Sequence, residues 1–146
     1  MITDIKTAII TISCLTDIKE DIAKFAQRSD LNDFQKWIVT ERYVLNPELD
    51  FQPQSIIIAA VGFKLCNVVF QDAGKTVISI VDLTVQADEV KAFLSRGNEY
   101  HFFYDYWLPQ KRLAVRSGLA EYGRNNICFV DGMGSVITLF VFISDF

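Results

Sequence analysis

The pattern of hydrophobic and polar positions in the first third of the chain predicts a strand followed by two helices. The β-branched run Thr7–Ser13 is typical of a short strand. Asp17 and Glu20 then resemble a capping box at the start of a helix. The apolar residues at helical spacing around it are Leu15, Ile18, Ile22 and Phe25. A second helix is predicted from Asp30. Its apolar face would hold Leu31, Phe34, Trp37 and Ile38.

The middle of the chain predicts a buried strand and then a hairpin. The run SIIIAAVGF at residues 55–63 is continuously apolar and bounded by turn residues, which is typical of a strand buried on both faces. Farther along, Asn67–Gln71 and Thr76–Leu83 flank the turn sequence Asp72-Ala73-Gly74-Lys75. A short helix, Asp88–Ser95, is predicted next.

The last third predicts one helix and a second hairpin. Pro109 fits the first turn of the helix, and Gly118 fits its end. The strands Ile127–Val130 and Val136–Ser144 surround the glycine-containing turn at residues 131–134. This irregular order of strands, helices and hairpins predicts a single α+β domain over residues 1–146. Its sheet would be mixed, largely antiparallel and flanked by helices.

Composition and charge narrow the classes of partner. Hydrophobic residues make up 51% of the chain, which supports a packed core. The net charge of −4 is spread without blocks, and the one basic group is too sparse for nucleic acid, although it could hold one anionic group. This basic group consists of Lys111, Arg112, Arg116 and Arg124. No apolar run is long enough to cross a membrane and no signal sequence is visible, so a cytoplasmic protein is expected.

The three cysteines do not form a recognisable metal motif. Cys14, Cys66 and Cys128 are far apart in the sequence, and no C-x-x-C run is present. Because each has apolar neighbours, they are predicted to be buried free thiols in a reducing compartment.

An aromatic segment at residues 97–109, GNEYHFFYDYWLP, is the first candidate for chemistry. Six of the eight residues from Tyr100 to Trp107 are aromatic. The segment either covers an edge of the core or forms a flat wall for a planar ligand. In the second case Tyr104, Tyr106 or Asp105 would project a polar group that could donate a proton. His101, between aromatic neighbours, is predicted to be a packed side chain.

A polar, glycine-rich segment at residues 113–135 is the second candidate. Arg116 and Ser117 end the predicted helix, where a cation can cap carbonyl groups. The run Arg124-Asn125-Asn126 is a donor-rich edge suited to carboxylate, amide or phosphate groups. Gly132-Met133-Gly134-Ser135 would let the backbone approach a ligand closely, but it lacks a dinucleotide fingerprint. The segment is thus either a polar loop or a surface that holds a ligand.

The sequence RLAVRSGLAEYGRNNICFVDGMGS, followed by VITLFVFISD, resembles the core segment of the epoxyqueuosine reductase-like iron–sulfur proteins, which are related to corrinoid-dependent reductive dehalogenases. The resemblance implies a nitroreductase-like scaffold that binds cobalamin and receives electrons from [4Fe–4S] clusters in a C-terminal region. The positions that match the family motif are Arg116, Ser117, Gly118, Gly123, Arg124, Asn125, Gly134 and Ser135, beside Asn126. They would line the cofactor side of the domain.

The chain departs from this family pattern at functional positions. Cluster-binding cysteines are expected shortly after Asp145 and are not in this chain, so it resembles the N-terminal core of a longer protein or a short version without its electron supply. Aligning back from the Arg116-Ser117-Gly118 motif puts Tyr104 at the family's proton donor, with Asp105 one residue away. Ala120 stands where a motif glycine is usual.

Three functions remain open from the sequence. The first is an oxidoreductase-like core that binds a corrinoid or another planar cofactor and is not competent for electron transfer alone. The second is a non-catalytic binding or dimerisation module, in which the apolar strand Val136–Ser144 pairs with a second copy. The third is a small flavin-using reductase, from the scaffold analogy alone.

Overall fold

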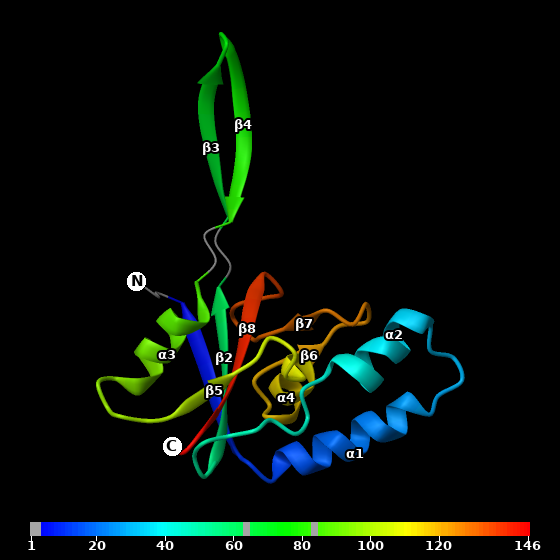
Figure 1. The fold of residues 1–146 in the computed structure, drawn as a ribbon. Coiled ribbons are helices and arrows are strands. Elements are labelled where there is room, and N and C mark those ends of the chain that lie inside the picture. The colour runs from blue at the N-terminus through cyan, green and yellow to red at the C-terminus, as the bar shows by residue number, and fades with distance from the viewer. Residues whose placement is uncertain (1–3, 63–64, 83–84) are drawn as a thin grey trace.

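The structure is a computed structural model that describes residues 4–62, 65–82 and 85–146. Its main sheet is antiparallel throughout. In spatial order its strands are β1 (Ile5–Thr11), β2 (Ser55–Gly62), β8 (Ile137–Ser144) and β5 (Phe102–Tyr104). The helices are α1 (Cys14–Ala26), α2 (Asp33–Trp37), the π-helix η1 (Ile38–Arg42), α3 (Ala87–Ser95) and α4 (Gln110–Arg116). The predicted α+β class is therefore confirmed (Figure 1).

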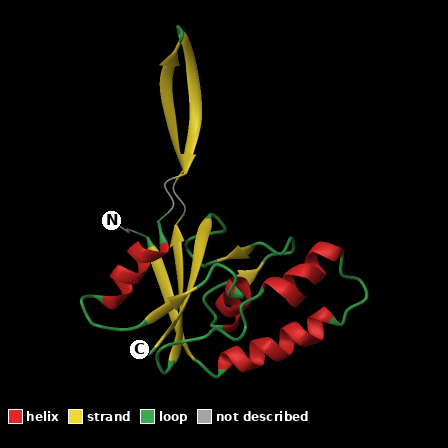
Figure 2. Ribbon diagram, viewed as in Figure 1, coloured by secondary structure: helices red, strands yellow, loops and turns green. Residues whose placement is uncertain are grey.

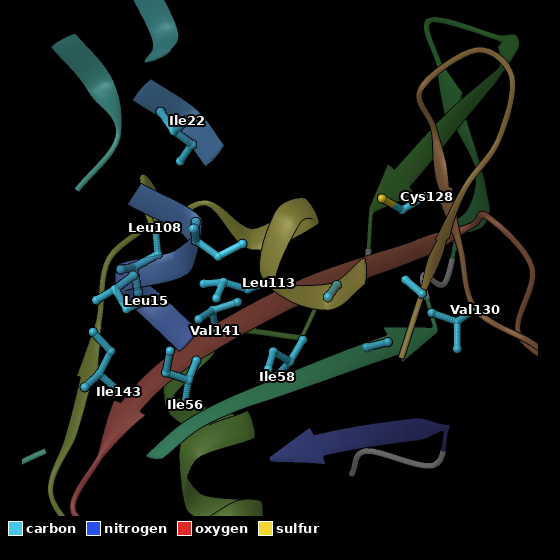
Figure 3. Packing of buried hydrophobic residues seen from close by; sticks show 14 of the residues in the cluster. Leu15, Ile22, Ile56, Ile58, Leu108, Leu113, Cys128, Val130, Val141 and Ile143 are labelled. Atoms are coloured by element: carbon cyan, nitrogen blue, oxygen red, sulfur yellow. The ribbon is translucent and has the colours of Figure 1, made fainter. Parts of the chain in front are cut away.

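Helices cover both faces of the main sheet (Figure 2). Helices α1 and α4 pack on one face, and α3 packs on the other. Strand β2 explains why the apolar run in the sequence has no alternation. Ile56 and Ile58 point into the core beneath Leu113 of α4, whereas Ile57 and Ala59 join the cluster around Val90 of α3. Figure 3 shows the first of these clusters, and the predicted burial of this strand on both faces is confirmed.

A separate hairpin of β3 (Leu65–Asp72) and β4 (Lys75–Asp82) extends away from the main sheet (Figure 1). Ala73 and Gly74 form its two-residue turn, and both have positive φ angles, 47° and 77°. A turn with two positive φ angles matches the twist of the flanking strands, which is why this short connection closes the predicted hairpin.

The second predicted hairpin is wrong. Strand β7 (Cys128–Phe129) pairs with β6 (Glu121–Tyr122), not with β8. Between β7 and β8 the chain closes a small turn, in which the N–H of Gly134 donates to the carbonyl of Val130 at 2.9 Å. This turn separates the two strands, so β8 is free to lie between β2 and β5, where its apolar side chains are buried.

The starts predicted for the first two helices are also displaced, and the side chains near them have other partners than expected. Helix α1 begins at Cys14, and Asp17 binds Arg116 at 2.5 Å instead of capping the helix. Helix α2 begins at Asp33 because Asn32 accepts from the backbone N–H of Gln35 at 2.8 Å, which completes a capping box.

Candidate functional site

A cleft of about 710 Å³ opens between helix α2 and the N-terminal part of α4. Its volume is in the range typical of sites for small molecules. The aromatic segment contributes Tyr106 and Trp107 to its lining, and the polar segment contributes Tyr122 and Asn126. The two candidate segments of the sequence therefore meet at one cleft, although through only a few of their residues.

Aromatic rings form the walls of this cleft. Phe34 of α2 is 67% exposed and Tyr106 is 70% exposed, so both rings are available to a ligand. Trp107 lies edge-on to Trp37, with ring centroids 6.2 Å apart. The Arg42 guanidinium lies 4.3 Å from the Trp107 ring centroid and 4.9 Å from that of Trp37. These contacts fix the Trp107 ring in place.

The charged side chains that line the cleft are mainly basic. Arg28 forms an ion pair with Asp30 at 2.6 Å. Lys111 Nζ donates to the backbone carbonyl of Asn126 at 3.2 Å, and the Arg112 guanidinium lies 4.7 Å from the ring centroid of Phe25. Neither Lys111 nor Arg112 forms an ion pair within residues 4–62, 65–82 and 85–146. Two cations of the cleft thus keep their charge unneutralised by a carboxylate.

The predicted catalytic residues lie outside this cleft lining. Tyr104 is half-buried at the end of β5, and its ring packs against Phe142 and Phe140, with centroid distances of 5.4 Å and 6.1 Å. Burial raises the pKa of the Tyr104 phenol, while Gln110 beside it acts in the opposite direction. Asp105 accepts the backbone N–H of Trp107 at 2.7 Å, which fixes the turn after β5.

Three predicted cofactor residues end helix α4. The guanidinium of Arg116 binds Asp17 of α1, so its nearest partner is a carboxylate and not a carbonyl of its own helix. The hydroxyl of Ser117 donates to the carbonyl of Ala114 at 2.9 Å. Gly118 has a φ of +76°, which suits the left-handed position after a helix. All three have local roles in ending α4 or joining it to α1.

The remaining predicted cofactor residues are divided between two loops. Asn126 lines the cleft and has a φ of 61°, whereas Asn125 accepts the backbone N–H of Ile127 at 3.3 Å. Arg124 is exposed, and no hydrogen bond or ion pair joins it to another described residue. Gly134 and Ser135 lie in the turn before β8 and are not part of the cleft lining.

Sequence reasoning did not connect helix α2 with a ligand site. Phe34 and Trp37 were predicted to share the apolar face of a helix, and α2 has only five residues, none of them buried. Phe34 lines the cleft, whereas Trp37 packs against the lining residue Trp107. Phe25 and Arg112 come from α1 and α4, and nothing in their local sequence indicates that they meet.

The cysteines do not gather into a cluster site. Cys128 is buried as predicted, whereas Cys14 is only partly buried and Cys66 is exposed on β3. No group of three or more potential metal ligands is found among the described residues.

His101 is exposed and paired, in contrast to the predicted packed side chain. Its Nδ1 lies 2.7 Å from Asp145 Oδ2, and its backbone N–H donates to Asp145 Oδ1 at 2.8 Å. The imidazole also stacks on Phe51, with centroids 5.6 Å apart. These contacts tie the segment before β5 to the residue that follows β8.

Comparison with protein-family models, with curated proteins and with solved structures finds no match to this chain. Within the described residues, no helix is both long enough and apolar enough to span a bilayer. The fold and the cleft define an α+β domain with an aromatic, basic ligand-sized groove beside α2.

Proposed function

We propose that this chain is the core domain of a redox protein of the epoxyqueuosine reductase-like class, and that it binds a corrinoid or another planar cofactor. The observation that carries the proposal is the environment of Tyr104, the position that the resemblance assigns to the proton donor. Its half-buried ring forms an aromatic wall with Phe140 and Phe142, whose side chains are only 4% and 0% exposed, so Tyr104 is the part of this wall that a ligand can reach. A planar apolar wall with one polar group is the chemistry that a macrocyclic ring requires.

One edge of strand β8 is partly unpaired beside this wall. Strand β5 pairs only with residues 142–144 of β8, and no other described strand pairs with residues 137–141 on that side. This unpaired stretch leads from Phe142, opposite Tyr104, back toward Gly134 and Ser135. Its residues 137–139 are partly exposed, whereas residues 140 and 141 are buried. The proposal therefore puts the planar cofactor along this stretch, with Tyr104 at one end and the glycine turn at the other.

Tyr104 would act as a proton donor in this arrangement. The phenol is protonated at neutral pH at its ordinary pKa, and burial raises that pKa further, so it would give its proton only to a strongly basic reacting group. A bound corrinoid would supply electron transfer to the substrate. The resemblance assigns the supply of electrons to [4Fe–4S] clusters in a C-terminal region.

Titration with hydroxocobalamin tests the proposal. We expect the protein to change the visible spectrum of the corrinoid and to gain thermal stability when it binds. Tyr104→Ala removes one ring of the wall, and we expect affinity to fall by roughly tenfold, the effect of about 1.4 kcal/mol. Tyr106→Ala is the matched control, because Tyr106 lines the cleft and not this wall. A spectrum and a melting temperature that cobalamin leaves unchanged would reject the proposal.

A dimerisation module is the second candidate, and the β3–β4 hairpin favours it. Val69, Ile78 and Ile80 are 60%, 67% and 67% exposed. They share one face of the hairpin, since Val69 is opposite Ile78 and Ile80 is opposite Asn67. A two-stranded hairpin alone is marginally stable in water, and its unpaired edges invite another strand. This surface, and not the interior strand β8, is the best candidate for contact with a second copy.

Light scattering across protein concentrations tests this second candidate. We expect the wild-type chain to show a concentration-dependent dimer, and the double variant Ile78→Lys, Ile80→Lys to be monomeric, because lysine charges oppose apolar contact. Ile9→Lys on the edge strand β1 is the control that keeps the dimer, since Ile9 is also exposed but lies on the main sheet. A wild-type chain that is monomeric at every concentration would exclude this function.

A further inference from the structure

We infer that the cleft beside α2 binds a second ligand, a single planar aromatic ring system that carries one phosphate group, as in a mononucleotide. Tyr104 does not line this cleft, and the nearest link between the two sites is Gln110, which lines the cleft and lies beside the Tyr104 phenol. The inference follows from two features of the cleft. It has exposed aromatic rings, and two of its cations, Lys111 and Arg112, form no ion pair with a described carboxylate.

The aromatic side chains that line the cleft can stack on the ring system of the ligand. Phe34 reaches the cleft from α2, and Tyr106 and Trp107 reach it from the segment after β5. The Trp107 ring is held by Trp37 and by the Arg42 guanidinium, so it offers a fixed face. Stacking of a base on such rings is tolerant of the base but requires a planar π-system. An aliphatic ligand of the same size would not use this geometry.

Two cationic side chains of α4 can bind the phosphate group of the ligand. Lys111 and Arg112 both line the cleft, and Arg112 is held near Tyr122 and over the ring of Phe25. Lys111 gives one hydrogen bond to the carbonyl of Asn126, which leaves further N–H donors for an anion. Hydrogen bonds from charged donors to phosphate oxygens are among the strongest in proteins. The remaining basic residue, Arg28, is engaged by Asp30.

The surroundings limit the ligand to a small one. The cleft has a volume of about 710 Å³, and because its lining residue Asp30 is paired with Arg28, Lys111 and Arg112 are the cations that face a ligand without a carboxylate partner. The whole chain carries a net charge of −4, which disfavours a polyanion such as nucleic acid. One ring system and one phosphate therefore fit both the volume and the charge.

Fluorescence titration with FMN, riboflavin and inorganic phosphate tests the inference, because FMN carries the ring and the phosphate while the other probes each lack one. We expect FMN to bind at least roughly tenfold more tightly than riboflavin, since the phosphate gains charge-assisted hydrogen bonds. Added salt should weaken FMN binding and leave riboflavin binding nearly unchanged. Equal affinities for FMN and riboflavin, or tight binding of phosphate alone, would overturn the inference.

Two variants test whether FMN binds in this cleft. Arg112→Gln removes the guanidinium charge and Phe34→Ala removes an exposed ring, and we expect each to weaken FMN binding roughly tenfold. Lys91→Gln on α3 is the charge control and should leave FMN affinity unchanged, because Lys91 is not part of the cleft lining. Circular dichroism melting of each variant separates lost binding from lost folding. FMN affinity that Arg112→Gln and Phe34→Ala leave unchanged in folded protein would refute this site.

The outcome is independent of the corrinoid proposal. Cobalamin binding that depends on Tyr104 can fail while FMN binding at Arg112 succeeds, and the reverse holds as well. Cobalamin affinity that falls in Arg112→Gln as much as FMN affinity would show one shared site and would contradict the separation inferred here.

Discussion

Asp145 has a defined partner in His101, and this pair makes a prediction about pH. The side-chain hydrogen bond from His101, then its backbone N–H, lowers the pKa of the Asp145 carboxyl below its ordinary value of 3.8. A carboxyl with a lowered folded-state pKa stabilises the fold above its unfolded pKa and loses that contribution as the pH falls through the folded value. Asp145→Asn removes the titrating group while keeping an acceptor for the backbone N–H.

Chemical unfolding of the wild-type chain and of Asp145→Asn checks this. We expect the wild-type chain to be more stable at pH 6, and the difference between the two to shrink below about pH 4 as Asp145 is protonated. The difference is expected to be small, because the pair is at the surface. A difference that stays constant down to pH 2 would contradict the assigned titration.

Individual residues were predictable where their role is local. Gly74 and Gly118 were expected at turns and helix ends, and each has the positive φ angle that such positions require. Arg116 was expected to cap carbonyls of its own helix, but its partner Asp17 is 99 residues away in the sequence. A local pattern holds no information on a contact of that range.

The β3–β4 hairpin is the element whose turn chemistry can be tested directly. Ala73 has a φ of 47°, which costs a residue with a Cβ about 1 kcal/mol relative to glycine. Ala73→Gly should therefore stabilise the hairpin. Gly74→Ala should destabilise it by a similar amount, since no atom lies within 4 Å of the added Cβ and only backbone strain remains.

Hydrogen exchange of the β3 and β4 amides measures both effects. We expect slower exchange in Ala73→Gly and faster exchange in Gly74→Ala, with the amides of β2 and β8 unchanged in both. Equal changes in the hairpin and in the main sheet would contradict the view that the hairpin is a separate unit.

The sequence predicted helices and strands well where the local pattern of apolar residues is sufficient. It predicted them poorly where a strand or helix face has several alternative partners. The hairpin β3–β4 follows from its own turn. Strand β7 pairs with β6, because the closed turn at Val130 and Gly134 directs β8 away from β7. The sequence alone does not show whether β6 or β8 is the partner of β7. Helix α2 shows the same limit, since its apolar face is real but borders a cleft.

At the scale of the whole molecule, strands β2 and β8 join two hydrophobic layers. Ile58 faces α1 and α4, and Ile57 faces α3, so the loss of either side chain disturbs a strand common to both layers. We expect Ile58→Ala and Ile57→Ala each to lower the free energy of unfolding by about 2–5 kcal/mol. Both variants should unfold in a single transition of the main sheet.

Thermal unfolding followed by near-ultraviolet and far-ultraviolet circular dichroism checks this coupling. Coincident curves at both wavelengths are expected for the wild-type chain and for both variants. Two separate transitions in Ile57→Ala, with the α1 and α4 layer melting later, would show that the layers fold independently.

The sequence by itself determined the α+β class, the burial of β2 on both faces and the turn of the first hairpin. Each of these depends on interactions within a few residues or on the average burial of a strand. Only the tertiary structure decided the pairing of β7, the partners of Arg116 and His101, and the meeting of Phe34 with Arg112 at one cleft. These pairings depend on contacts between segments that are distant in the sequence. For each pairing, the chain offers several alternative partners with the same local chemistry.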